Sequence, residues 1–552
     1  MKLQKDHLVF LPLGGSNEIG MNVNLYHYKG KWILMDFGAG FADEMLPGVD
    51  MIVPDINFIL DNRKDFLGIV LTHAHEDHMG AMPYLWDQLE CPVWATPFTA
   101  NVVKAKMKSN SAHHDAFVKK LTIVNPGAEM KIGPFDLEFV QITHSIPEMN
   151  GVMIRTEHGN VFHTGDWKLD DTPVVGALTE EAKLRKYGDE GVLAMVCDST
   201  NVFNDRISGS EGALLDSITQ LVSTCKGLVV VSTFASNVAR IETIARAAQR
   251  NGRKVALAGR SLWTVTTAAR EAGYLQDIPA FISNLEIKKH KRDELLVICT
   301  GCQGEPNAAM AKLVKREHPD FRLSQQDTVI FSSKVIPGNE KKIFRMFNGL
   351  VRLGSEVFTE KDHFVHVSGH PSREELRKMY EWVRPQIAIP VHGEAAHLHE
   401  HVRFAKEIGI PKQIQMQNGQ AVKLAPGTPE VLGVLDIKYF GVDGKQLLPP
   451  EGEVIRTRRK LMRDGIVIVS MALTRRGGFV EEPKIIAPGL VDDKVHRKLL
   501  REIAEEVMDV VESGRDNSND EVIKTTRSLI RRIFEYEFGK RPGLVEVFIT
   551  RV

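Results

Sequence analysis

Residues 73–78 read His-x-His-x-Asp-His and follow directly on the apolar run "GIVLT". Imidazole and carboxylate groups are rarely buried without partners, so a fold that places them at a buried strand's end must supply those partners. His73 and His75 project to the same side of an extended chain, and Asp77 and His78 follow where helical spacing begins. One short loop can therefore present ligands to two metal ions, since neutral imidazole and carboxylate suit zinc, manganese or iron. The alternative is a solvated polar loop, or a helix cap that uses Asp77.

A pair of metal ions needs further ligands, and three candidates also lie at the ends of predicted strands. His144 closes "FVQITH", Asp166 closes "NVFHTGD" and His392 closes "IAIPVH". Any one of them alone would be an ordinary surface or core residue. Together with the loop they predict two ligand sets, one formed by His73, His75 and His144, the other by Asp77, His78 and His392, with Asp166 bridging both.

Length and composition limit the classes of protein that remain. A chain of 552 residues is too long for one core and predicts roughly two to four domains. With 43% hydrophobic and 26% charged residues, and no apolar run of about 20 residues, it is typical of a globular protein without a membrane helix. The start lacks the pattern of a signal peptide, and the five cysteines are sparse and odd in number, so we expect a cytoplasmic protein. A net charge of −1 means that any basic surface for nucleic acid is local.

The pattern of apolar residues predicts a discontinuous first domain with a second domain inserted into it. Short strands and Gly-rich turns fill the first 200 or so residues, and strand-like "HFVHVSG" and "IAIPVHG" return near the end of the insertion. Between them, helical stretches alternate with continuous apolar strands, which is typical of a parallel sheet. The predicted boundaries are a first domain over 1–207 and 361–427, an insertion over 208–360, a linker over 428–455 and a small α+β domain over 456–552.

The order and spacing of several motifs resemble a known superfamily. "THAHEDHMGA", His144, "HTGD", "CDST" and "PVHGE" resemble the metallo-β-lactamase superfamily. "HVSGHPS" beside "PVHGE", with the insertion before them, resembles its β-CASP nucleases, and "STFASN" and "CTGCQGEP" resemble the ribonuclease J family in particular. The resemblance covers nearly the whole chain. It implies an α/β fold in which a metallo-β-lactamase αββα sandwich carries an inserted β-CASP parallel-sheet domain and a small α+β C-terminal domain.

The resemblance also implies a mechanism that uses two divalent ions per chain, Zn²⁺ or Mn²⁺. Such a pair lowers the pKa of a water molecule to about 7, and that water then attacks phosphorus. Asp77 and Asp166 would orient it, and His370 would act as general acid or phosphate clamp. The alternative for His370 is a capping or core histidine. Asp198 is expected to orient a ligand histidine through its free ring nitrogen.

Two further segments are implied to hold the 5′-monophosphate and terminal nucleotides of the RNA. They comprise Ser236 and Asn237 in "FASN", and His366, Val367, Ser368, Gly369, His370 and Ser372 in "HVSGHPS". A Gly-containing turn before a helix can direct backbone N–H groups at a phosphate. The alternative for "FASN" is a cap of the next helix, and both can hold. Pro371 departs from the small residue expected there and has no N–H to donate.

The activity implied is that of a 5′→3′ exoribonuclease that favours 5′-monophosphorylated single-stranded RNA and also cuts internally, in RNA maturation and decay. A homodimer or homotetramer and other RNA-decay proteins are the expected partners. Alternatives are a DNA nuclease or a small-molecule hydrolase on the same metal site, or an inactive RNA-binding scaffold.

Two weaker features of the sequence leave their roles open. Asp50 is a turn residue or a ligand of a structural cation. Basic clusters at 455–460, 474–478 and 524–532 are solvated faces, an RNA track or part of a dimer interface.

Overall fold

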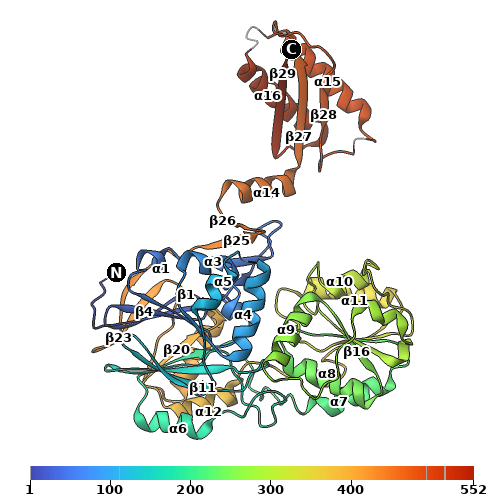
Figure 1. Cartoon of the computed structure of the whole chain (residues 1–552). Helices are drawn as coiled ribbons and strands as arrows, with labels where there is room; N and C mark the ends of the chain where they lie inside the picture. Colours follow the sequence, from blue (N-terminus) through green and yellow to red (C-terminus); the bar gives the residue numbers. More distant parts are fainter. Residues whose placement is uncertain (1, 111, 493, 515–517) are drawn as a thin grey trace. The chain divides into compact units, whose positions relative to one another are not determined.

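The computed structural model describes residues 2–110, 112–492, 494–514 and 518–552. The chain forms two compact units (Figure 1). The first unit comprises Met1–Gly40 and Val53–Lys438, and the second comprises Phe41–Ile52 and Tyr439–Val552.

Two sheets lie face to face in the first unit. The eight-stranded sheet has, from edge to edge, β24 (Glu430–Val434), β23 (Gln420–Ala425), β1 (Leu8–Gly14), β3 (Val23–Tyr28), β4 (Lys31–Met35), β7 (Phe66–Val70), β8 (Val93–Ala95) and β9 (Leu121–Ile123). The seven-stranded sheet has β10 (Glu129–Ile132), β11 (Phe135–Gln141), β12 (Asn150–Thr156), β13 (Gly159–His163), β14 (Ala194–Asp198), β20 (Ile387–Val391) and β22 (Lys412–Gln413).

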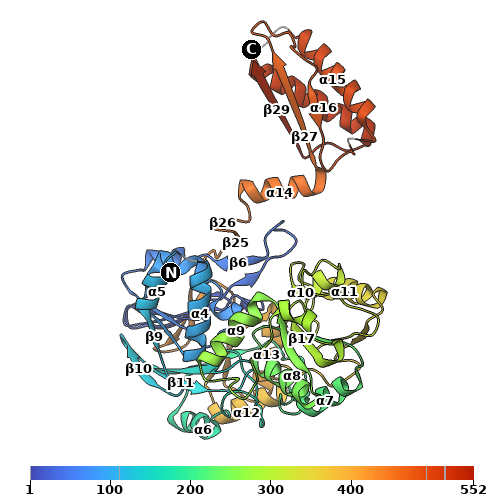
Figure 2. The same ribbon diagram turned by 45° about the vertical axis from the view of Figure 1, so that its right-hand side comes forward.

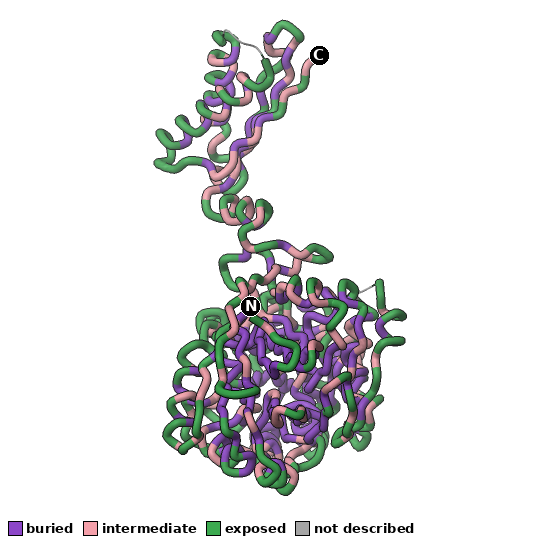
Figure 3. The backbone as a smooth tube through the Cα atoms, turned by 90° about the vertical axis from the view of Figure 1, so that its left-hand side faces the viewer, coloured by how far each residue is buried: buried purple, intermediate pink, exposed green. Residues whose placement is uncertain are grey.

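The alternation of side chains along the strands builds the layers of this sandwich. In β12, Val152 and Ile154 join the core between the sheets, whereas Met153 faces the opposite way, into a second core under helices. The helices over that second core are α6 (Glu181–Glu190), α12 (Arg373–Val383) and α13 (Ala395–Glu407). On the eight-stranded side lie α3 (Met82–Leu89), α4 (Pro97–Asn110) and α5 (His114–Lys120) (Figure 1). The expected αββα sandwich is confirmed, and Figure 3 shows its buried interior.

The inserted segment forms a separate sheet in which every pairing is parallel. Its order is β16 (Lys254–Ala258), β17 (Leu295–Cys299), β15 (Val229–Ser232), β18 (Thr328–Phe331) and β19 (Glu356–Phe358). β15, β17 and β18 are buried throughout, as the continuous apolar runs predict for a sheet covered on both faces. Around it lie α7 (Leu214–Thr224), α8 (Val238–Arg250), α9 (Arg260–Glu271), α10 (Ala309–Val314) and α11 (Glu340–Arg352) (Figure 2).

Two local expectations differ from the structure. Residues 363–369, expected as a strand, contain none, although Val365 and Val367 are buried. The alternation of apolar residues that suggested a strand therefore comes from an irregular segment in which Val365 and Val367 are buried. Residues 428–455, expected as a linker, include β24, β25 (Tyr439–Asp443) and β26 (Gln446–Leu448). Their Pro and Gly residues fit turns between short strands, which composition alone does not separate from a linker.

The second unit contains a three-stranded sheet with two long helices. β27 (Ile466–Leu473) lies between β28 (Lys484–Ile486) and β29 (Leu544–Arg551). Every second residue of β27, from Val467 to Leu473, is buried against α15 (Arg497–Glu512) and α16 (Asn519–Phe538). The helix α14 (Glu453–Asp464) precedes the sheet in sequence. The small α+β domain expected at the C-terminus is confirmed.

Candidate metal centre

The histidine loop connects β7 to the short helix α2 (Glu76–Met79), and His75 is the residue before that helix. His73 Nε2 lies 3.0 Å from His75 Nδ1, and His144 Nε2 lies 3.1 Å from the same atom. With Asp166 these residues form a group whose potential ligand atoms all lie within 4.8 Å of one another. The structure thus brings together the residues predicted for the first ion.

A second group shares Asp166 with the first. It contains Asp77, His78, Asp166 and His392, again with ligand atoms within 4.8 Å of one another. His78 Nε2 lies 3.1 Å from one Asp166 oxygen, and His392 Nδ1 lies 2.9 Å from the other. Asp166 therefore occupies the position expected of a residue that serves two ions.

The sheet topology explains why residues so far apart in sequence meet here. β13, β14 and β20 are neighbouring parallel strands, and Asp166, Asp198 and His392 lie at or just beyond their carboxyl ends. β11 runs in the same direction as β13, because each is antiparallel to β12, so His144 reaches the same edge. Ligands of α/β sheets commonly gather at this edge.

The two groups differ in the protonation preferences of their histidines. Burial alone would lower the pKa of His78 and His392, but the neighbouring carboxylates, Asp166 first among them, outweigh it and raise both well above the ordinary value. In the second group a bound cation would therefore have to displace protons from these rings.

The protonation preferences of the first group and of Asp77 suit metal ligation. Burial lowers the pKa of His73 and His144 well below the ordinary value, and lowers that of His75 to about 4, so these rings keep free lone pairs. Burial alone would raise the pKa of Asp77 and Asp166, but the neighbouring histidines outweigh it and lower both, which keeps the carboxylates ionised.

One buried atom in the cluster lacks a satisfactory partner. Within the described part of the chain, His392 Nε2 makes no hydrogen bond, although an Asp77 oxygen lies 3.1 Å away. A ring nitrogen and a carboxylate that approach without hydrogen-bond geometry are arranged as two ligands of one cation would be. The donor set of imidazole nitrogens and carboxylate oxygens therefore fits divalent metal ions.

Asp36, which was not among the predicted site residues, contacts the histidine loop through His78 and Thr72. It follows β4, is fully buried, and one of its oxygens lies 2.7 Å from His78 Nδ1. Thr72 donates its N–H and its hydroxyl to the same carboxylate, at 2.8 and 2.9 Å, and the Thr72 hydroxyl lies 2.9 Å from His73 Nδ1. Asp36 thus orients His78 and, through Thr72, His73. Asp36 follows directly on the apolar run "KWILM", and this position at the end of a strand could have identified it as a candidate from the sequence.

His370 belongs to a third group of potential ligands, with Asp166, Asp198 and His392, and it is paired with Asp198. His370 Nδ1 donates to an Asp198 oxygen at 2.7 Å, whereas His392 Nδ1 is 3.6 Å from the other oxygen. Burial alone would lower the pKa of His370, but the carboxylates of Asp198 and then Asp166 outweigh it and raise the pKa. Asp198 was expected to orient a metal-ligating histidine. Its nearest histidine is His370, and the predicted ligand His392 lies farther away, so the expected role of Asp198 stays a prediction.

The segment 366–370 contacts the cluster through its backbone. His144 Nδ1 donates to the carbonyl oxygen of Gly369 at 2.6 Å, which leaves Nε2 to face His75. A Cβ atom at Gly369 would lie 3.1 Å from the His144 ring, so a larger residue would crowd it. The Ser368 hydroxyl accepts from the His370 N–H at 3.1 Å. This segment therefore positions His144 and His370.

Arg240 joins the two segments implied to bind the RNA end. It is fully buried in α8 and donates to the carbonyl oxygens of Val365 and Val367, at 3.2 and 3.4 Å. His366 Nδ1 lies 3.3 Å from the same guanidinium. The Asn237 side chain accepts from the Arg240 N–H at 2.8 Å, which confirms the helix-capping alternative for Asn237. No local pattern around Arg240 indicated this role.

Ser236 and Ser372 have different surroundings. Ser236 is half-buried and precedes Asn237 at the start of α8. Ser372 is fully buried, and its hydroxyl forms a capping box with Glu375 at the start of α12. Because the Ser372 hydroxyl is buried and bonded to Glu375, it is not exposed for the RNA contact that was predicted for it. Asp50 is exposed and belongs to no ligand group among the described residues.

Comparison with known families and proteins accounts for most of the chain. Family models match a beta-lactamase superfamily domain at 31–185, the ribonuclease J beta-CASP domain at 226–350, a Zn-dependent metallo-hydrolase RNA specificity domain at 356–415 and the ribonuclease J C-terminal domain at 453–552. A protein of Sinorhizobium meliloti named ribonuclease J is 42% identical over 100% of this chain and 98% of its own length. The chain belongs to the ribonuclease J family.

A second member of the ribonuclease J family corresponds to most of this chain. The ribonuclease J of Thermus thermophilus is 32% identical over 92% of this chain and 89% of its own. A crystal structure of a protein of unknown function from Enterococcus faecalis V583 matches with a TM-score of 0.51 at 17% identity, over 75% of this chain and 99% of that one, which supports the fold. Among the residues that the structure describes, no helix has the length and apolar character to cross a membrane.

Proposed function

We propose that this member of the ribonuclease J family is a metal-dependent ribonuclease that hydrolyses RNA phosphodiester bonds. The observation that carries the proposal is the sharing of Asp166 by the two predicted histidine–aspartate groups at one sheet edge, with His370 in a third group that also contains Asp166. Hydrolytic two-metal sites use such a shared arrangement. The names of the relatives in Sinorhizobium meliloti and Thermus thermophilus point to RNA as the substrate.

Two divalent ions, Zn²⁺ or Mn²⁺, would occupy the two groups. One would be held by His73, His75 and His144, the other by Asp77, His78 and His392, with Asp166 serving both. Once bound, such ions would lower the pKa of a water molecule to about 7 and stabilise the charge that develops on the phosphate. Asp77 and Asp166 would accept hydrogen bonds from the attacking water and orient it.

His370 is proposed to protonate the leaving 3′-oxygen. Because its Nδ1 is engaged by Asp198, Nε2 is the ring nitrogen available for the substrate. The pKa of His370, which Asp198 raises against the opposing effect of burial, favours the protonated ring that a general acid requires. Asp198 would therefore act through His370, as a positioning residue.

The RNA 5′ end is proposed to lie against residues 366–370 and the start of α8. The support is that Arg240 fixes Val365–Val367 to α8, close to Ser236 and Asn237. Such a pocket would favour a 5′-monophosphate and 5′→3′ removal of nucleotides, with internal cleavage as a second activity. The homodimer or homotetramer, the cytoplasmic location and the association with RNA-decay proteins stay predictions.

The test compares one RNA with a 5′-monophosphate, its 5′-triphosphate form and the matching DNA, each incubated with the protein and Mn²⁺ or Zn²⁺. The proposal predicts mononucleotides released mainly from the monophosphorylated RNA. Internal fragments alone, whatever the 5′ end, would remove the roles of Ser236 and Asn237. Preferential cleavage of DNA would overturn the substrate, and no cleavage of any of them by protein with metal bound would favour a small-molecule hydrolase.

A further inference from the structure

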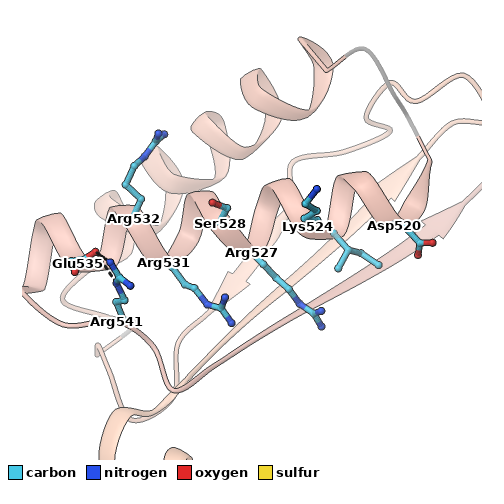
Figure 4. Close-up of a pocket in the computed structure, with 9 residues that line it drawn as sticks. Asp520, Lys524, Arg527, Ser528, Arg531, Arg532, Glu535 and Arg541 are labelled. Carbon is cyan, nitrogen blue, oxygen red and sulfur yellow. Dashed lines mark hydrogen bonds and ion pairs between the residues drawn. The ribbon is translucent and has the colours of Figure 1, made fainter.

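A groove runs along α16 in the second unit, and the proposed catalytic residues take no part in it. It has a volume of about 790 Å³ (Figure 4). Its basic lining residues are Lys524, Arg527, Arg531, Arg532 and Arg541. A concentration of positive charge in a chain of net charge −1 is the local basic surface that binding to nucleic acid would require.

The spacing of the basic residues makes a stripe along the helix. Lys524, Arg527 and Arg531 are three and four residues apart, which places them on one side of α16. Figure 4 shows Arg527 and Arg531 extending to the same side of the helix. At about 1.5 Å per residue the stripe from Lys524 to Arg531 is about 10 Å long, over which a nucleic acid strand carries more than one phosphate.

Part of this charge has no protein partner. Arg541 pairs with Glu535 at 2.7 Å and Arg527 with Glu546 at 3.0 Å, both near the surface. Exposed ion pairs contribute about 1 kcal/mol or less, so a phosphate can replace either carboxylate. Among the described residues, Arg531 and Arg532 form no ion pair, and both are exposed. Guanidinium groups in this state are available for bidentate contacts with phosphate.

The lining chemistry distinguishes RNA from a protein partner. Ile523 is the one apolar side chain among the lining residues, and none of them is aromatic. Protein interfaces concentrate binding energy in aromatic and apolar anchors, whereas interfaces with nucleic acid are polar and strongly positive. Without aromatic platforms for bases, the groove would contact the backbone and not read the sequence.

We propose that the α16 groove binds the phosphate backbone of single-stranded RNA, as a second contact for the substrate besides the catalytic unit. The choice of RNA as its occupant rests on the proposed function. Long RNA offers enough phosphates for both contacts, whereas an oligonucleotide of two or three nucleotides has none left for the groove once the catalytic unit holds it.

The test measures binding of a long, fluorescently labelled single-stranded RNA to the full chain by anisotropy, without added metal and over a range of salt concentrations. The variant Arg531→Gln/Arg532→Gln should bind RNA more weakly than the unaltered chain, whatever the RNA sequence. The slope of log affinity against log salt should fall by about 1.4, since each phosphate contact of a single strand contributes about 0.7. Arg531→Lys/Arg532→Lys keeps both charges and should restore most of the slope.

The matched control is Arg497→Gln/Arg501→Gln on α15, which changes the net charge equally at two exposed positions outside the groove. Equal loss of affinity in control and groove variants would overturn the proposal in favour of general charge attraction. An altered oligomeric state with unchanged RNA affinity would overturn it in favour of a protein interface.

Turnover of a short 5′-monophosphorylated oligonucleotide with metal should be unchanged in the groove variant. If the unaltered chain binds RNA through the groove but cleaves none, the proposed function fails while the groove stands.

Discussion

Replacing Arg240 tests whether a buried ion pair fixes the segment that positions His144 and His370. The Arg240 guanidinium donates to both oxygens of Glu211, at 3.0 and 2.8 Å, and neither residue is more than 1% exposed. Methionine has a similar length but no charge, so Arg240→Met leaves the Glu211 carboxylate buried without its cation. Breaking a buried pair in this way costs about 3–5 kcal/mol. The free energy of local opening around α8 should fall by that amount.

Native-state hydrogen exchange of peptides from α8 and from residues 363–370 measures this opening directly. Global unfolding is unsuitable, because a chain with several domains does not unfold in one step. The double variant Arg240→Met/Glu211→Leu removes both charges and should lose less than Arg240→Met alone. Arg250 on the same helix pairs with Asp216 at 2.7 Å at the surface, so Arg250→Met should change the opening free energy by less than about 1 kcal/mol. A loss of under 1 kcal/mol for Arg240→Met, or additive losses in the double variant, would refute the reasoning.

Further substitutions address single contacts. Asp36→Ala removes the partner of His78 and should weaken metal affinity by about 10–100-fold in a chelator competition, so unchanged affinity would deny Asp36 a supporting role. His370→Ala should lose RNA turnover while metal content by elemental analysis stays the same, and retained turnover would make His370 structural. Asp198→Asn removes the carboxylate that raises the pKa of His370; since the acid must be protonated, the alkaline limb of the pH–rate profile should move to lower pH, and an unmoved limb would argue against the pair. Asn237→Ala removes a helix cap and should lower the opening free energy of the first turn of α8 by about 1 kcal/mol by hydrogen exchange, whereas no change would leave the side chain free for RNA.

The sequence contained enough information to predict the architecture and the residues that the fold brings together as potential metal ligands. His73 to His78 stand out because four potential ligands fall in six positions, and His144, Asp166 and His392 each follow an apolar strand. Parallel strands bring their carboxyl ends to one edge, so strand-end residues can be grouped before the fold is known. The inserted sheet was predictable for a related reason, since its central strands are continuous apolar runs.

The parts that could not be predicted depend on contacts between distant segments. Arg240 resembles any charged residue of an amphipathic helix, yet its partners Glu211 and Val365 are 29 and 125 residues away. Ser372 was expected to contact RNA because of its neighbours in sequence, but its hydroxyl caps α12. The close pairing of Asp198 with His370, nearer than His392, depends on the path of residues 366–370, which have no regular structure.

The central claim is that the two groups sharing Asp166 hold two divalent ions on which RNA hydrolysis depends. Its most direct test is metal content per chain by mass spectrometry, together with turnover of 5′-monophosphorylated RNA, for the unaltered chain and for His73→Ala. The account predicts two ions per unaltered chain, fewer in the variant, and turnover lost in the variant while its fold, followed by circular dichroism, is kept. Full turnover by a variant depleted of metal, or by the unaltered chain with no metal bound, would contradict it.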